Sequence, residues 1–298
     1  MSQKPISLVS AEWLGTHLGD PEIRVVDIRG AVRAIDTGNG RQVASYEALE
    51  GDYLSGHIPG AVFVNWTRDI VDSEAEVKVQ IAPPQRFAEV MGRLGVGAET
   101  FVVAVDGTGG HLATRLWWAL RYYGHERVAV LDGGMAYWLA NGFPMEVGPV
   151  TVAPKEFFPA AQPAWISNAD DVLALTHSKQ RQLVDARDTG TFLGDVQRAP
   201  RGGHIPTAVN LPAGELMAAD GRWKTPHEIR RTVEAHGLDP DSPVTAYCNG
   251  GVTATAVLFG LHLAGHTDLS NYDGSWNEWG SRLDLPVEGN KDLWNTEP

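Results

Sequence analysis

The chain contains an internal repeat whose unit has the size of a whole domain. Four blocks of sequence return in the same order; they occupy 25–31 and 183–189, 55–64 and 202–211, 101–114 and 243–255, and 122–138 and 263–279. The second block, for example, reads SGHIPGAVFV in the first copy and GGHIPTAVNL in the second. The copies are offset by roughly 140 to 160 residues, whereas solenoid repeats have units of about 20 to 50 residues. The sequence therefore predicts two copies of one domain.

A connector rich in proline and small residues separates the two copies. It reads VGPVTVAPKEFFPAAQPAW. Prolines at this density favour an extended chain over a helix or a strand. We therefore predict an N-terminal domain at 1–146, a linker at 147–163 and a C-terminal domain at 164–298.

Short apolar runs alternate with amphipathic stretches in both copies. The runs expected to form strands are IRVVDI, FVVAV, RVAVL, RQLVDA and PVTAY. The stretch TPHEIRRTVEAHGL begins with an N-cap residue, Thr225, and a capping-box glutamate, Glu228. In SNADDVLAL we expect Ser167 and Asp170 to act in the same way. Strands that alternate with helices predict an α/β fold, in which each domain is a central parallel sheet flanked by helices.

Composition narrows the functional classes. With 43% hydrophobic and 20% charged residues in 298, the chain has the make-up of a soluble globular protein. Its formal net charge of -13 argues against a nucleic-acid partner, because phosphate binding requires clustered Lys and Arg side chains. The opening residues lack the apolar core of a signal peptide, and no run of about 18 uncharged apolar residues follows. We predict a cytoplasmic protein with small-molecule partners, no membrane contact, no metal and no cofactor.

The only cysteine, Cys248, lies where an apolar strand meets a helical pattern, in TAYCNGGVTAT. Ligand sites of parallel sheets lie at the carboxyl ends of strands, which is where this loop begins. Two glycines let the loop turn tightly enough for several N–H groups to converge, and the helix start adds partial positive charge. Such surroundings favour the thiolate, which is the nucleophilic form of cysteine.

A buried, inert cysteine is the alternative, because free cysteine often packs as a small hydrophobic side chain. The repeat argues against it. The equivalent position of the first copy is Asp106, in AVDGTGGH, and a carboxylate is a poor substitute for a packed thiol. We therefore predict a reactive Cys248.

Two familiar kinds of cysteine chemistry lack their partner residues. A protease-type nucleophile needs a histidine base. His57, His125, His204 and His266 all lie in motifs shared by the two copies, so we expect structural roles for them. A cysteine phosphatase needs an arginine six positions after the cysteine, where this chain has Ala254.

Four motifs point to a known family. They are YLSGHIPGA at 53–61, GGHIPTAVN at 202–210, CNGGVTA at 248–254 and NYDGSWNEW at 271–279. Through them the chain resembles the tandem-domain rhodanese sulfurtransferases over nearly its whole length. The resemblance implies that the second domain is catalytic and that Cys248 takes up sulfane sulfur as a persulfide. It implies a degenerate first domain, as Asp106 in place of the cysteine suggests.

Convergent N–H groups suit the terminal sulfur of a persulfide in the manner of an oxyanion hole. The candidates in the active-site loop are Asn249, Gly250, Gly251, Val252 and Thr253. The sulfur would then pass to cyanide, a thiol or a protein acceptor.

The residues after the cysteine leave the sulfur donor open. Family members that prefer thiosulfate typically carry Arg and Lys there, whereas this chain has Asn249 and Gly250. Members that prefer 3-mercaptopyruvate typically have Gly and then Ser, supported by an Asp and a His of the first domain. Gly250 takes that Ser position and Gln80 falls where the His is expected. Thiosulfate is slightly favoured because these supporting residues are absent.

Arginines are the candidates for binding an anionic donor. Arg187 and Arg201 lie where the family gathers substrate-binding arginines, although Thr191 occupies a position that is often Arg. Arg187 could instead form a structural pair with Asp273, and Arg198 is a weaker candidate that could be a simple surface charge.

Two functional hypotheses follow from the sequence. The first is a thiosulfate or 3-mercaptopyruvate sulfurtransferase that acts through a Cys248 persulfide. The second is a persulfide carrier or regulatory binding module without turnover, which the nearly uncharged loop CNGGVT favours because it lacks the usual ligands of an anionic donor.

Overall fold

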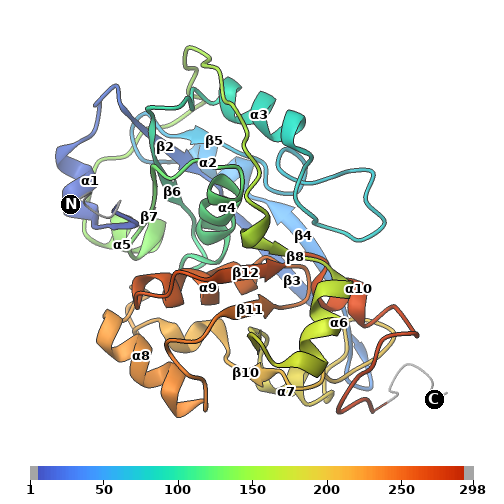
Figure 1. Cartoon of the computed structure of the whole chain (residues 1–298). Coiled ribbons are helices and arrows are strands. Elements are labelled where there is room, and N and C mark those ends of the chain that lie inside the picture. The colour runs from blue at the N-terminus through green and yellow to red at the C-terminus, as the bar shows by residue number, and fades with distance from the viewer. Residues whose placement is uncertain (1–5, 292–298) are drawn as a thin grey trace.

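Two parallel five-stranded sheets form the framework of the computed structural model, which describes residues 6–291 (Figure 1). In order across the first sheet, the strands are β1 (Leu8–Val9), β7 (Val128–Leu131), β6 (Phe101–Val105), β2 (Ile23–Asp27) and β5 (Val62–Phe63). Across the second they are β8 (Ile166–Ser167), β12 (Leu269–Tyr272), β11 (Val244–Tyr247), β9 (Gln182–Asp185) and β10 (Val209–Asn210). Equivalent segments of the repeat take equivalent places in the two sheets. The predicted α/β fold with two similar domains is confirmed.

Helices flank both sheets. In the first half of the chain they are α1 (Ala11–Thr16), α2 (Glu50–Ser55), α3 (Pro84–Arg93), α4 (His111–Tyr122) and α5 (Gly134–Ala140). In the second half they are η1 (Pro163–Trp165), α6 (Ala169–Ser178), α7 (Thr189–Phe192), η2 (Ala213–Leu216), α8 (Pro226–Ala235), α9 (Thr253–Leu263) and α10 (Ser275–Trp279). No helix within residues 6–291 is long and apolar enough to cross a membrane.

One of the two predicted helix caps is confirmed and the other is wrong by one residue. Thr225 and Glu228 form the expected capping box at the start of α8. At α6 the capping box consists of Asn168 and Asp171, not Ser167 and Asp170. The reason is that Ser167 still belongs to β8, where its hydroxyl lies 2.6 Å from that of Ser270 on the neighbouring strand.

The helices that follow the two equivalent loops pack against each other at the centre of the molecule. Figure 1 shows α4 and α9 side by side between the two sheets. The hydroxyls of Thr114 and Thr255, which are equivalent in the repeat, lie 3.1 Å apart. Next to them, the ring of Trp117 packs edge-on against Phe259 at 5.0 Å. One hydrophobic core therefore continues from the first domain into the second.

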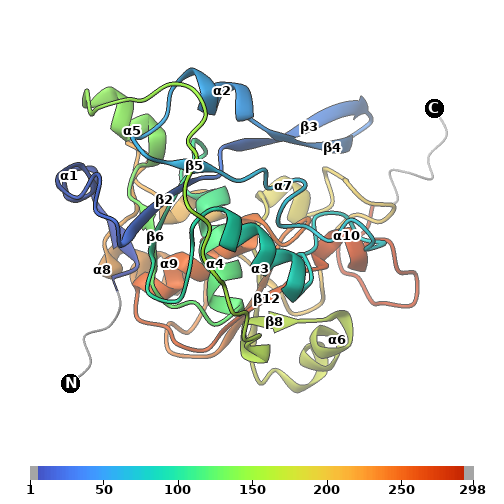
Figure 2. The same cartoon turned by 90° about the horizontal axis from the view of Figure 1, so that it is seen from above.

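An antiparallel hairpin that the sequence interpretation missed extends from the first domain. It consists of β3 (Gly30–Gly38) and β4 (Arg41–Ala48), joined by a turn in which Gly38, Asn39 and Gly40 all have positive φ. Figure 2 shows it running outward from the first sheet toward α7 of the second domain. Backbone hydrogen bonds of 2.8 Å join Gln197 to Gly40 and to Gln42 of the hairpin. The hairpin thus brings first-domain side chains to the second domain.

Candidate active site

Cys248 directly follows β11, opens the loop to α9 and lines a small pocket between the domains. The residue is buried, with 4% of its surface exposed. The pocket has a volume of about 170 Å³. Residues that line it from the second domain are Ala186, Arg187, Asp188, Arg198, Asn249, Gly250, Val252 and Thr253; from the hairpin they are Val32, Ala44 and Tyr46. The structure therefore brings four of the five predicted loop residues to the pocket; Gly251 is the exception.

The backbone of the loop is tied down through its carbonyl groups. Trp276 N–H donates to the carbonyl of Cys248 at 3.0 Å, and Asn277 N–H donates to that of Asn249 at 2.7 Å. The N–H of Cys248 donates to Ser275 Oγ at 3.1 Å. Within the described residues, no acceptor is found for the backbone N–H groups of 249–253. These donors are left for a ligand or for the sulfur of Cys248 itself.

The equivalent loop of the first domain holds an anion of its own. Asp106 Oδ1 accepts from the N–H groups of Thr108 (3.2 Å) and Gly110 (2.9 Å). Oδ2 accepts from the N–H groups of Leu112 (2.7 Å) and Ala113 (2.9 Å) and from the Thr108 hydroxyl (2.9 Å). A loop of this shape is therefore a cage for a negative charge at the end of its strand, which is where Cys248 stands in the second domain.

A first-domain arginine fixes the loop of Cys248 from behind. Arg115 on α4 is 2% exposed, and it forms a salt bridge with Asp273. Its Nη1 also donates to the carbonyl of Gly251 at 3.2 Å, and its Nη2 to that of Val79 at 2.9 Å. The Asp273 carboxylate accepts in addition from the N–H of Ile81 at 2.7 Å. The repeat has Ala256 at the position equivalent to Arg115, so the second domain has no such arginine for the loop of Asp106.

Gly250 and Gly251 are needed for two different reasons. A Cβ on Gly250 would lie 2.6 Å from Val79 Cγ2 and 3.0 Å from Asn277 Nδ2, so any side chain there would require Val79 to move. Gly251 has a φ of +70°, a conformation that other residues rarely adopt. Val79 itself has a φ of +62°, which is strained for a β-branched residue and is held by its bond to Arg115.

The three arginines proposed from the sequence have different surroundings. Arg187 lines the pocket, but its Nε donates to both oxygens of Asp185, at 2.9 and 3.0 Å. The suggested pairing with Asp273 is wrong, because Asp273 is bound to Arg115. Arg198 also lines the pocket, and its Nε donates to Gln42 of the hairpin at 2.9 Å.

Arg201 does not reach this pocket. Its guanidinium donates to the carbonyl groups of Trp279, Gly280, Arg282 and Leu285, which fixes the chain after α10. Thr191 is buried and donates to Asp188 Oδ2 at 2.8 Å. Arg198, the weaker candidate from sequence, is therefore the cation that the structure places at the pocket with no carboxylate bound to it among the described residues.

The histidines of the shared motifs bind the backbone and do not line the pocket of Cys248. His57 Nδ1 lies 2.8 Å from the carbonyl of Tyr53, and the equivalent His204 Nδ1 lies 2.9 Å from that of Phe192. His125 Nε2 lies 3.0 Å from the carbonyl of Thr100. These positions agree with the structural role expected from their occurrence in both copies.

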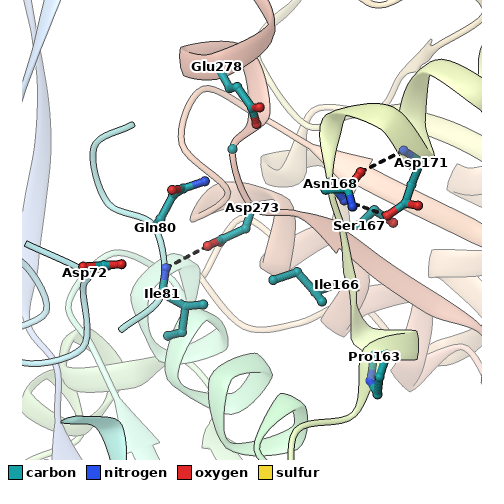
Figure 3. Close-up of a pocket in the computed structure, with 11 residues that line it drawn as sticks. Asp72, Gln80, Ile81, Pro163, Ile166, Ser167, Asn168, Asp171, Asp273 and Glu278 are labelled. Atoms are coloured by element: carbon teal, nitrogen blue, oxygen red, sulfur yellow. Dashed lines mark hydrogen bonds between the residues drawn. The ribbon is translucent and has the colours of Figure 1, made fainter. Parts of the chain in front are cut away.

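Gln80 belongs to a separate interdomain pocket of about 480 Å³ (Figure 3). There it lies near Asp72 of the same loop and near Asp273 and Glu278 of the second domain. Cys248 does not line this pocket, and Gln80 does not line the pocket of Cys248. Asp273 lines this pocket and also binds Arg115, which contacts the loop of Cys248.

The functional residues that sequence reasoning missed come from the first domain. Tyr46, Val32 and Ala44 reach the pocket on the hairpin, and Arg115 reaches the loop from α4. The turn sequence Gly38–Asn39–Gly40 between two runs of alternating polarity was the available signal for the hairpin. Nothing local to Arg115 indicates its distant partner.

Comparisons with known proteins agree with this geometry. The model of the rhodanese-like domain matches residues 10–141 and again 168–282. The 3-mercaptopyruvate sulfurtransferase of Escherichia coli strain K12 is 36% identical over 283 residues, which cover 94% of this chain and 97% of the relative. The human 3-mercaptopyruvate sulfurtransferase is 35% identical, with coverage of 92% and 91%. The bovine thiosulfate sulfurtransferase is 34% identical, also with coverage of 92% and 91%.

A solved structure supports the same relationship. The crystal structure of SseA from Escherichia coli, a 3-mercaptopyruvate sulfotransferase, superposes with a TM-score of 0.80 at 34% identity, covering 91% of this chain and 99% of that one. The chain belongs to the rhodanese family and is an enzyme of the sulfurtransferase type.

Proposed function

We propose that the enzyme moves sulfane sulfur from a small anionic donor, through a persulfide on Cys248, to cyanide or a thiol acceptor. The observation that carries the proposal is the pair of equivalent loops. In one, backbone N–H groups surround the Asp106 carboxylate; in the other, the N–H groups of 249–253 have no acceptor within the described chain and follow Cys248. The second loop is thus suited to a negatively charged sulfur.

The proposed reaction has two halves. The Cys248 thiolate attacks the outer sulfur of the donor, a new S–S bond forms, and the donor's remaining part leaves with the electron pair of the broken bond. The terminal sulfur of Cys248–S–S⁻ is then stabilised by the loop N–H groups in the way an oxyanion hole stabilises oxygen. An acceptor attacks that terminal sulfur, and the Cys248 thiolate returns.

Charge at the pocket favours a donor with one negative charge. Arg187 is neutralised by Asp185, and the carboxylate of Asp188 lines the same pocket as Arg198. A single available cation beside a carboxylate is a weak site for doubly charged thiosulfate. The apolar wall of Val32, Ala44 and Val252 suits an organic donor. We therefore place 3-mercaptopyruvate, the substrate in the names of several relatives, ahead of thiosulfate, which the sequence alone had slightly favoured.

The two domains have separate roles in this proposal. The C-terminal domain, 164–298, carries the reaction, and the N-terminal domain, 1–146, supplies the hairpin wall and Arg115 but no thiol. The linker is 147–163. A thiol that alternates between reduced and persulfide forms suits a reducing compartment such as the cytoplasm.

The alternative is a persulfide carrier or binding module without turnover. Intact mass of the protein after incubation with 3-mercaptopyruvate or thiosulfate separates the two, when combined with an assay for thiocyanate formed from cyanide. A gain of one sulfur atom together with thiocyanate supports the enzyme. A gain without thiocyanate, and without turnover on small thiols, favours the carrier; no gain with either donor contradicts both.

A further inference from the structure

Tyr46 is the polar side chain that the hairpin brings to the pocket of Cys248. The other two hairpin side chains that line the pocket, Val32 and Ala44, are apolar. The ring of Tyr46 packs edge-on against Trp66, with centroids 5.7 Å apart. Trp66 is itself fixed, because it is buried and its Nε1 donates to the carbonyl of Glu47 at 3.0 Å. The phenol is therefore held by packing rather than free to swing into solvent.

The hydroxyl of Tyr46 lies above the catalytic loop. The ideal Cβ position of Gly250 is 3.7 Å from the Tyr46 oxygen, which is ordinary van der Waals distance. Asn277 Nδ2 donates to the same oxygen at 3.4 Å, and the backbone N–H of Asn277 is bound to the carbonyl of Asn249. The phenol and the loop are thus joined through one residue of α10.

The proton of this hydroxyl has no partner within residues 6–291. The bond from Asn277 uses a lone pair of the phenol oxygen and leaves its O–H undirected. Asn249, which lines the same pocket, has a buried Oδ1 without a hydrogen bond among the described residues. Buried polar groups normally have partners, so the O–H of Tyr46, a residue that lines the pocket, is a donor that a ligand can use.

The phenol of Tyr46 carries a proton that it can donate. Burial raises the pKa of Tyr46 most; the hydrogen bond from Asn277 lowers it, a negative charge on Cys248 raises it, and the charge of Arg198 lowers it. The phenol therefore stays protonated at neutral pH.

We propose that Tyr46 is a catalytic residue that donates its proton to the enolate leaving group of a mercapto-ketoacid donor. This inference rests on the proposed function and concerns its first half. The thiolate attacks the donor's thiol sulfur, an S–S bond forms, the C–S bond breaks, and the electron pair goes to carbon as an enolate. The phenol proton passes to the enolate. The resulting tyrosinate takes the proton of Cys248–S–SH, so that pyruvate and Cys248–S–S⁻ remain and no outside reagent is consumed.

The other polar side chains of the pocket are poorer proton donors than Tyr46. Arg187 and Arg198 hold their protons too strongly to transfer them, and the hydroxyl of Thr253 is a far weaker acid than a phenol. The two sulfur donors differ in whether their leaving group needs a proton. Sulfite leaves thiosulfate as a stable anion and needs no proton, whereas an enolate does.

The test compares the two donors on Tyr46→Phe, which keeps the ring and its contact with Trp66. General acid catalysis contributes about 10²-fold or more, so kcat for pyruvate release from 3-mercaptopyruvate should fall by that order. KM should change little, because the proton is donated only as the C–S bond breaks. Sulfite release from thiosulfate by the same variant should stay within about 3-fold of the wild type. Tyr137→Phe, which removes a hydroxyl bound to Glu12 far from the pocket, is the matched control.

Three results would overturn the inference. One is a Tyr46→Phe enzyme with unchanged pyruvate release. Another is an equal loss with both donors, which would show that Tyr46 only positions the loop. The third is a wild type that gains sulfur from thiosulfate but not from 3-mercaptopyruvate, since no enolate would then form. In each case a sulfur atom gained by wild-type Cys248 would leave the proposed persulfide chemistry standing.

Discussion

Replacing Asp106 by Asn tests the idea that both loops are cages for a negative charge. The substitution keeps the shape of the side chain but turns one acceptor oxygen into an NH₂ donor. If Oδ2 is replaced, the N–H groups of Leu112 and Ala113 lose their acceptor; if Oδ1 is replaced, those of Thr108 and Gly110 do. In either orientation two backbone donors lose their acceptor, and the other two keep a neutral acceptor in place of a charged one.

The loss of stability expected for Asp106→Asn follows from the burial of this site. Asp106 is 1% exposed, so water cannot replace the lost acceptor. A buried donor left without a partner costs about 1–3 kcal/mol, which gives about 2–6 kcal/mol for two of them. This is a large fraction of the ~5–15 kcal/mol that stabilises a typical protein, and the midpoint of urea unfolding should fall clearly.

A surface aspartate provides the matched control. Asp36 on the exposed hairpin also accepts a backbone bond, from Gly38 at 2.8 Å, but its change to Asn should alter stability by no more than about 0.5 kcal/mol. Sulfur uptake per folded molecule should be unchanged in both variants, because neither touches Cys248. An Asp106→Asn protein as stable as Asp36→Asn would refute the view that the loop requires an anion.

Two further predictions concern the domain interface and pH. Arg115→Ala should leave Asp273 buried without its cation and lower the free energy of unfolding by about 3–5 kcal/mol. It should also slow alkylation of Cys248 in the folded protein, and added guanidinium ion at non-denaturing concentration should partly restore that rate. A normal rate would show that Arg115 does not position the loop. Burial lowers the pKa of His125 in the folded protein. As the pH falls below about 6.5, the imidazole is therefore protonated more readily in the unfolded chain than in the folded one, and this lowers the stability of the fold. The urea midpoint of His125→Gln should therefore drop less than that of the wild type between about pH 7 and pH 5; an equal drop would assign the acid sensitivity elsewhere.

The fold was predictable because its signals are local and occur twice. Apolar runs such as FVVAV became β6, and the Thr225 capping box starts α8 as predicted. Because the same motifs occur in the same order in a second copy, the repeated segment could be recognised as a domain. The error at Ser167 was of one residue, because Ser167 and Asn168 are both good capping residues and only strand pairing decides between them.

The site was predictable only as far as one chain segment could specify it. Cys248 and its loop lie on contiguous sequence with a fixed position relative to β11. Arg115 contacts Gly251 across 136 positions of sequence, and Tyr46 lies more than 200 positions before Cys248, so their roles depend on how the domains pack. For Arg201 the sequence motif was misleading. The motif suggested that Arg201 binds the substrate, whereas its guanidinium donates to backbone carbonyl groups at the end of α10 and after it.

The mass of the intact protein after brief exposure to 3-mercaptopyruvate or thiosulfate tests the central claim most directly. The wild type should gain one sulfur atom and lose it again on addition of cyanide, with one thiocyanate formed for each sulfur lost. Cys248→Ser should gain none under the same conditions and should unfold at a similar urea concentration. A wild type that stays at its original mass with both donors, or a Cys248→Ser protein that gains sulfur, would contradict a persulfide at Cys248.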